Sequence, residues 1–122
     1  MNIQKLLKLN TKIDKLTDGT YEYTTLKPIQ FKDGFQATFQ TLTDNYNTTE
    51  FWNLVTWYEK ITDGTFYIGK YDGNIEISFH FDFENDAKEI CKEYNQYSYW
   101  DWAKNTEIKN KYYKLGLGND YI

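Results

Sequence analysis

The segment around Asp72-Gly73 constrains the fold more than any other part of the chain. On both sides of it apolar and polar residues alternate, which is the period-two pattern of half-buried β-strands. Asp-Gly is also a favoured pair at the tip of a tight hairpin, because Gly adopts a positive φ without strain. The apolar positions are Phe66, Ile68, Ile75, Ile77, Phe79 and Phe81. The sequence therefore predicts an antiparallel hairpin across residues 66–81.

Three segments place apolar residues at helical spacing. The first covers about residues 2–16 and has lysines on its opposite face. The second runs from about 48 to 60, and Asn47 followed by Glu50 predicts a capping box at its start. The third follows Asp82, whose carboxylate is expected to cap it. These patterns predict three amphipathic helices that pack against a sheet.

Two further strands are expected before the second helix, at residues 21–25 and 35–41, where Tyr, Phe and Thr recur at alternate positions. The connection over 26–34 contains the only proline and is too long for a tight turn, so we expect it to project. Near the end of the chain, Ser98 is placed to cap a fourth helix that runs to about residue 113.

A repeated motif predicts how these elements are organised. Residues 15–21, Lys-Leu-Thr-Asp-Gly-Thr-Tyr, recur as Lys-Ile-Thr-Asp-Gly-Thr-Phe at 60–66. This indicates two tandem helix–hairpin units over 2–45 and 48–82, followed by a C-terminal helical segment over 83–122. Chance similarity between two helix ends is the alternative. The expected fold is a single α+β domain of 122 residues, with a four-stranded antiparallel sheet packed by helices on one face.

Charge and composition limit the ligands that this chain can bind. Eighteen acidic residues oppose fourteen basic ones, all of them lysine, for a net charge of −4. Arginine is the residue best suited to bidentate recognition of phosphates and bases, so its absence argues against ordinary nucleic-acid binding. A bias toward Lys, Asn and Thr codons in an AT-rich genome explains the same composition equally well. Direct nucleic-acid binding is therefore not the favoured function.

The N-terminal segment and the cysteine content predict a cytoplasmic location. Lysines interrupt the apolar positions of the first eight residues, so we expect neither a signal-peptide core nor a membrane span there. Cys91 is the only cysteine and cannot form an internal disulfide, which is typical of a protein in a reducing compartment. We expect the protein to act in the cytoplasm of a host cell.

Few residues are suited to catalysis. The only histidine, His80, follows Ser78 and Glu76 in a row that superficially suggests a hydrolase triad. In a strand these three side chains share one face but lie roughly 6–7 Å apart, which is too far for a direct relay. We therefore interpret the row as an outward polar face on which His80 has no partner, and we expect no enzymatic activity.

The metal-binding patterns are incomplete as well. One histidine and one cysteine exclude a zinc site of the usual composition. Asp82, Glu84, Asp86 and Glu93 have the spacing of a calcium loop, but Ala87 occupies the position that requires glycine. No glycine-rich phosphate loop follows a predicted strand. We expect neither a metal nor a cofactor.

The segment 82–101 combines acidic and aromatic residues. It carries six acids and two lysines, whereas residues 1–16 are net positive. An acidic helix can imitate the negative field of a nucleic acid, and Tyr and Trp are common anchors of protein interfaces. The alternatives are a solvated helix face and aromatic residues that close the end of the sheet. The expected partner-binding residues are Glu84, Glu89, Glu93, Tyr99, Trp100, Asp101 and Trp102.

In size, acidity, Lys/Asn/Thr bias and lack of catalytic residues, the chain resembles the small inhibitors carried by phages and mobile elements, including anti-CRISPR proteins. The resemblance is one of composition. It implies a stoichiometric inhibitor that binds a larger basic host protein, such as a nucleic-acid-processing defence enzyme, and occupies its nucleic-acid groove. Two alternatives are an immunity protein that neutralises a toxin and a small module that binds nucleic acid through lysines and exposed aromatics.

Overall fold

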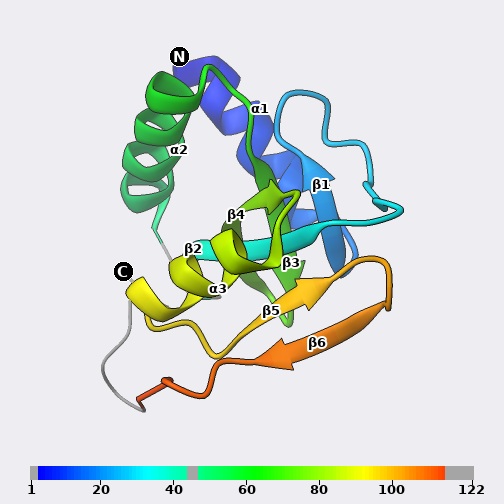
Figure 1. Ribbon diagram of the computed structural model, residues 1–122. Coiled ribbons are helices and arrows are strands. Elements are labelled where there is room, and N and C mark those ends of the chain that lie inside the picture. Colours follow the sequence, from blue (N-terminus) through cyan, green and yellow to red (C-terminus); the bar gives the residue numbers. More distant parts are fainter. Residues whose placement is uncertain (1–2, 44–46, 115–122) are drawn as a thin grey trace.

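The computed structural model describes residues 3–43 and 47–114. Three α-helices and six β-strands follow one another along these residues (Figure 1). None of these three helices is long and apolar enough to cross a bilayer. The fold is α+β, as predicted from the sequence. The elements are α1 (Ile3–Asp14), β1 (Gly19–Glu22), β2 (Phe35–Leu42), α2 (Thr48–Thr62), β3 (Tyr67–Tyr71), β4 (Asn74–Phe81), α3 (Glu84–Glu93), β5 (Ser98–Asp101) and β6 (Thr106–Lys109).

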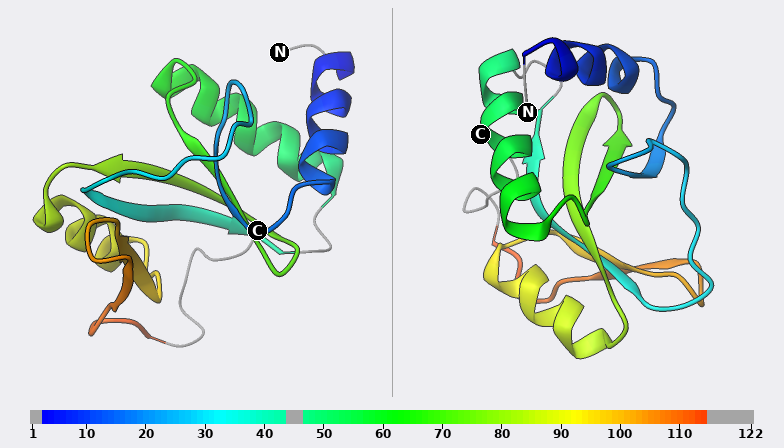
Figure 2. Two further views of the ribbon diagram at one scale, coloured as in Figure 1. Left: turned by 90° about the vertical axis from the view of Figure 1, so that its right-hand side faces the viewer. Right: turned by 90° about the horizontal axis from the view of Figure 1, so that it is seen from above.

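The strands form one antiparallel sheet in the order β1-β3-β4-β2-β5-β6. The helices α1 and α2 lie over one end of this sheet, and α3 lies over the other (Figures 1 and 2). The register shows that α2 and α3 cover the same face. Ala37 packs against α3 and pairs with Phe79, whose ring lies 5.9 Å from that of Tyr58 on α2.

Two apolar clusters form the core on this covered face. The larger one joins Ile13 of α1 and the inner side of α2 to strands β2–β4 and to Tyr23, which follows β1. The smaller one joins α3 to β2 and β5. In addition, the Lys70 ammonium group donates hydrogen bonds of 2.8 Å to the carbonyls of Ile13 and Asp14. A cation is favourable there, because these carbonyls lie at the negative C-terminal end of α1.

The strongest local predictions are confirmed. Strands β3 and β4 form the expected hairpin, and its tip residues Asp72 and Gly73 have φ values of 52° and 82°. These two positive values fit the turn that best matches strand twist. The predicted capping box is also present, because the side chain of Asn47 accepts from the Glu50 amide and the Glu50 carboxylate accepts from the Asn47 amide.

The start of α3 differs from the prediction. The N-cap residue is Phe83, which has no capping side chain, and the helix begins at Glu84. Asp82 lies one residue too early to cap it, and its carboxylate is 4.0 Å from the ring of His80. Glu84 and Asp86 occupy the first turn, where negative charge is favourable.

The prediction of two tandem helix–hairpin units in a four-stranded sheet is not matched. Strand β1 pairs with β3 and not with β2, so the β3–β4 hairpin lies between the two strands of the supposed first unit. The chain after β1 turns at Leu26 and runs back along β1, where the Ile29 amide donates to the Thr20 carbonyl. The outer edge of β1 is thereby occupied, and β2 pairs with β4 instead.

The two copies of the repeated motif also make different turns. Gly64 has a φ of 82° and follows Asp63, which is left-handed at the C-cap of α2. Gly19 has a φ of 154° and already belongs to β1. The repeat predicts the same helix-to-strand turn in both copies, with a positive φ at Gly19 or Gly64. Both φ values are positive, but only Gly64 adopts the left-handed conformation that ends a helix, so the two turns are not equivalent.

The predicted fourth helix at 98–113 is wrong. Residues 98–109 form the β5–β6 hairpin, which extends the sheet beyond β2. Consecutive aromatic residues suit a strand, because their side chains point to opposite faces of the sheet. Here Tyr99 is buried on the covered face, while Trp100 lies partly buried on the opposite face. The predicted C-terminal helical segment therefore contains one helix, α3, within the described residues up to 114, and residues 115–122 lie outside them.

Candidate functional site

Helix α3 presents one buried and one exposed side. Ala87 and Cys91 are buried against the sheet. The Cys91 thiol donates to the carbonyl of Gln96 at 3.4 Å, and burial raises its pKa to about 11. Such a thiol stays protonated and unreactive at neutral pH. Cys91 is therefore a packing residue.

The acidic side chains of this segment are exposed. Among the described residues, one of these acids has an ion-pair partner: Asp82 lies 4.0 Å from the ring of His80. Glu84 accepts a hydrogen bond of 2.8 Å from the Tyr99 hydroxyl, whose pKa is raised by burial and by this carboxylate. The exposed acids are Asp82, Glu84, Asp86, Glu89 and Glu93. They form the acidic surface of α3.

The structure divides the predicted partner-binding residues between two faces. Tyr99 and Asp101 point to the covered face and are only 4% and 5% exposed. Trp100 points to the opposite face, where Trp102 also lies, and both line a pocket there. The acidic surface of α3 and the two tryptophans therefore do not form one continuous surface.

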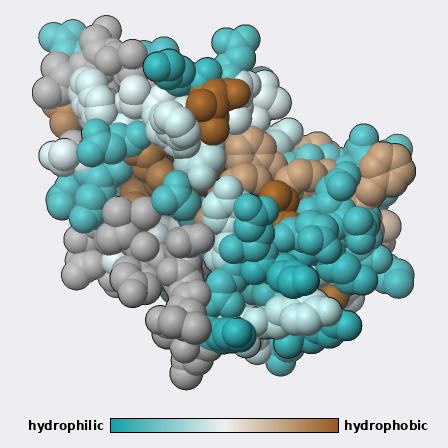
Figure 3. Space-filling model, turned by 60° about the vertical axis from the view of Figure 1, so that its left-hand side comes forward, coloured by the Kyte–Doolittle hydropathy of each residue, from teal (hydrophilic) through white to brown (hydrophobic). Residues whose placement is uncertain are grey.

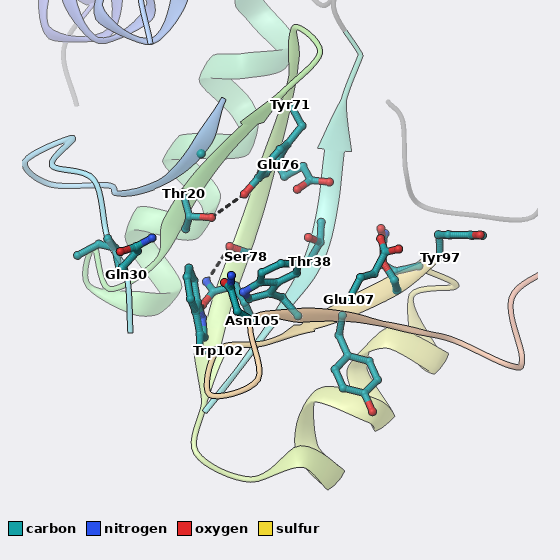
Figure 4. A pocket seen from close by; sticks show the side chains of 17 residues that line it. Thr20, Gln30, Thr38, Tyr71, Glu76, Ser78, Tyr97, Trp102, Asn105 and Glu107 are labelled. Carbon is teal, nitrogen blue, oxygen red and sulfur yellow. Dashed lines mark hydrogen bonds between the residues drawn. The ribbon is translucent and has the colours of Figure 1, made fainter. Parts of the chain in front are cut away.

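The pocket lies on the face of the sheet that the three helices leave uncovered, and its volume is about 610 Å³ (Figure 4). Its floor is the polar side of β2 and β4, including Gln36, Thr38, Glu76 and Ser78. Loop residues Ile29 and Gln30, Tyr71 of β3, and the β5–β6 hairpin with Trp100 and Trp102 complete its walls. In Figure 4, Tyr71 and Glu76 lie at one end and Trp102 and Asn105 at the other.

A hydrogen-bonded chain holds the floor of the pocket in place. Trp102 Nε1 donates to Gln36 Oε1 at 3.1 Å, and Gln36 Nε2 donates to Ser78 Oγ at 2.9 Å. Nearby, the hydroxyls of Thr20 and Tyr71 are 2.9 Å apart. Trp100 Nε1 is buried and has no hydrogen-bond partner among the described residues. The pocket therefore offers one unused donor beside a preorganised polar floor.

Glu76 is the most perturbed carboxyl group in this pocket. Its removal from water raises its pKa to about 7, and a hydrogen bond from Thr38 partly opposes this shift. A carboxyl group with this pKa exchanges its proton near neutral pH. Perturbed carboxyls in pockets are frequent at functional sites, although structural groups show the same behaviour.

The Glu76, Ser78 and His80 row lies on the uncovered face, as the alternation predicted. The expectation that His80 has no partner is wrong. Its ring stacks on Phe31 with centroids 3.8 Å apart, and its Nε2 is 2.9 Å from the carbonyl oxygen of Asp33. Ser78 is bonded to Gln36. The row therefore anchors the 26–34 loop and forms the pocket floor.

Neither a metal site nor a known relative explains these features. Within residues 3–43 and 47–114, no three His, Cys, Asp or Glu side chains come together in a way that could hold a metal ion. Comparison with family models, with curated proteins and with solved structures finds no match. The acidic surface of α3 and the pocket are therefore the two features of the structure that bear on function.

Sequence reasoning missed the pocket, although part of its signal was visible. The alternation of β4 identified Glu76 and Ser78 as residues of one polar face. What covers that face was not visible, because the 26–34 loop and the β5–β6 hairpin reach it through contacts between distant residues, such as His80 with Asp33 and Trp100 with Gln36.

Proposed function

We propose that this protein is a non-enzymatic inhibitor that binds a basic groove of a larger protein through the acidic surface of α3. The observation that carries the proposal is the exposure of five acids in and beside one short helix, with Asp82 alone in an ion pair among the described residues. The two lysines of α3, Lys88 and Lys92, offset only part of this charge, and the remaining negative field accelerates association with a positive partner.

The same surface suits nucleic-acid mimicry. Carboxylates on a helix can occupy positions where a groove otherwise holds phosphates, and the backbone that carries them is already ordered before binding. On the face drawn in Figure 3, apolar side chains form separate groups among hydrophilic ones.

The inferred biological setting is counter-defence by a phage or mobile element, in the manner of anti-CRISPR proteins. The target in this setting is a nuclease or another nucleic-acid-processing enzyme in the host cytoplasm. An immunity protein for a toxin would bind its target by the same chemistry. A nucleic-acid-binding module would instead use the exposed lysines of α1, which are Lys5, Lys8 and Lys12, together with Lys15 just after it.

Charge reversal tests the proposal directly. The Glu89→Lys/Glu93→Lys variant should lose binding to the basic protein captured from a host lysate, and the remaining binding should depend less on salt. Asp14→Lys/Asp18→Lys is the matched control, because it changes the net charge equally at two exposed residues outside α3. Its binding should stay within a few-fold of wild type.

Two results would contradict this function. One is equal capture by the wild-type protein and the α3 variant, with both folded by circular dichroism. The other is salt-sensitive binding of plain DNA or RNA that disappears when the α1 lysines are replaced, which would establish the nucleic-acid-binding alternative.

A further inference from the structure

The pocket on the uncovered face has a charge pattern that selects its ligand. Among the described residues that line it, two carry charge, Glu76 and Glu107, and both are acidic. Glu107 accepts a hydrogen bond of 2.7 Å from the Ser98 hydroxyl. No lysine lines the pocket in the described part of the chain. A phosphate or carboxylate ligand would therefore find no cationic side chain to pair with among these residues and would be repelled by the two acids.

Aromatic rings supply the second feature. The indoles of Trp100 and Trp102 lie with centroids 6.3 Å apart and planes at 78°, so they form two sides of a corner. Trp102 is held from behind by Phe31, at a centroid distance of 5.6 Å, and by its bond to Gln36. Fixed indole rings bind cations through their electron-rich faces, and the interaction strengthens where water is excluded.

Glu76 supplies the third feature, which is a carboxyl group without a counter-ion. No lysine lies within ion-pair distance of it among residues 3–43 and 47–114. Partial burial disfavours its charged form, as the raised pKa shows. A cation bound next to it would reverse this penalty, because an opposite charge favours the ionised carboxylate.

We propose that this pocket binds a small organic cation whose ammonium, amidinium or guanidinium group pairs with Glu76 at one end of the pocket and whose body extends toward Trp102 and the neighbouring Trp100 at the other. The volume of about 610 Å³ lies within the range of small-molecule sites and exceeds the needs of a single inserted side chain. The ligand is therefore a free molecule whose planar or aliphatic body lies on the indole rings. This site is separate from the acidic surface of α3 and does not depend on it.

A series of three nearly isosteric probes tests the proposal. Benzamidinium is a cation, benzamide is neutral and benzoate is an anion, so they differ mainly in charge. Titrations followed by nuclear magnetic resonance of the amide and indole groups should show benzamidinium binding at least tenfold more tightly than benzamide at pH 8. Benzoate should not bind. The shifted signals should include the Trp100 and Trp102 indole N–H groups.

Variants identify the residue that provides the charge. Glu76→Gln keeps the size and the hydrogen-bonding capacity of the side chain, and it should weaken benzamidinium binding about tenfold or more. Asp14→Asn removes an exposed carboxylate at the end of α1 and should change nothing. In the wild type, affinity should fall about tenfold from pH 8 to pH 6, because the carboxyl with a pKa of about 7 becomes protonated. Glu76→Gln should abolish this pH dependence, whereas a pH dependence that arises from another group would persist in this variant.

Three outcomes would overturn the proposal. The first is equal affinity of the wild type for all three probes, a result that needs no variant to fold. The second is unchanged benzamidinium binding by folded Glu76→Gln. The third is binding of a peptide-borne arginine with no binding of benzamidinium, which would assign the pocket to a protein partner.

Discussion

The indole of Trp102, just after β5, donates a hydrogen bond to the side chain of Gln36 on β2 at 3.1 Å. Gln36 is 7% exposed, and its amide nitrogen in turn donates to Ser78 of β4, so one chain of hydrogen bonds fixes all three side chains. The backbone amide of Trp102 also donates to the carbonyl of Gly34. A residue that sequence analysis assigned to a partner interface is thus a structural wall of the pocket.

Trp102→Phe should lower the free energy of unfolding by about 1–2 kcal/mol, because it leaves the buried oxygen of Gln36 without its donor while keeping an aromatic ring beside Phe31. Urea denaturation monitored by circular dichroism measures the change. Trp57→Phe is the control, since Trp57 is 57% exposed on α2, and it should change stability by less than about 0.5 kcal/mol. Equal effects of the two substitutions would show that the hydrogen bond from Trp102 to Gln36 does not contribute to the free energy of unfolding.

Gly34→Ala should destabilise the protein by more than about 2 kcal/mol. Gly34 has a φ of 85°, and an added Cβ would collide with the His80 ring and lie 2.8 Å from the Phe81 carbonyl oxygen. Gly64→Ala is a matched control, because its φ is 82° and its nearest contacts would be Thr24 Cγ2 at 3.3 Å and the Tyr23 ring at 4.0 Å. We expect about 1 kcal/mol there from backbone strain alone. If the two variants have the same thermal midpoint, close packing at Gly34 is not important.

Glu76 should make stability depend on pH. Its pKa rises from 4.5 to about 7 on folding, so the folded state binds the proton more tightly than the unfolded state. Stability is then greatest below about pH 4.5 as far as this group is concerned, and it falls as the pH rises toward 7. Glu76→Gln should remove this decline and be more stable than the wild type at pH 8, by roughly 1–3 kcal/mol after allowance for partial solvent access.

Denaturation curves at several pH values between 4 and 8 test the Glu76 prediction. Above pH 6, the free energy of unfolding of Asp14→Asn should change with pH in the same way as that of the wild type. A wild-type stability that rises between pH 5 and 7, with Glu76→Gln parallel to it, would mean that Glu76 is ionised freely in the folded state.

His80 should contribute to stability through the loop that it anchors. His80→Ala removes both the stacking on Phe31 and the bond to the Asp33 carbonyl, and should cost about 2 kcal/mol. His80→Phe keeps the stacking and should recover about half of that loss. Hydrogen exchange should show faster exchange at Ile29 in the alanine variant, since the Ile29 amide lies in this loop and donates to the Thr20 carbonyl of β1. If exchange at the Ile29 amide is unchanged, His80 does not hold this loop in place.

Local interactions account for what the sequence predicted correctly. The β3–β4 hairpin depends on Asp72-Gly73 and on alternation within sixteen residues, and the start of α2 depends on Asn47 and Glu50. Both sets of contacts join residues close in the chain, so their patterns can be read directly. The α+β class follows from the same local signals.

The segment 98–113 shows why the predicted fourth helix was wrong. A cap residue followed by spaced aromatics fits a helix, yet the same residues become β5 and β6 because β5 finds a partner in β2, where Gln36 pairs with Trp100. Likewise, the repeated motif did not produce equivalent units, since the 27–29 segment took the edge of β1. Pairing energy between distant segments outweighs weak local preference.

The sequence by itself determined the helices α1 to α3, the central hairpin, the polar face that includes Glu76 and Ser78, and the negative charge of the α3 segment. Only the tertiary structure decided the strand order, the separation of Trp100 and Trp102 from the acids of α3, and the pocket that these tryptophans enclose. The reason is physical. Periodicity specifies which side of an element is apolar, but the burial of Glu76 depends on which distant strand and loop come to lie over that side.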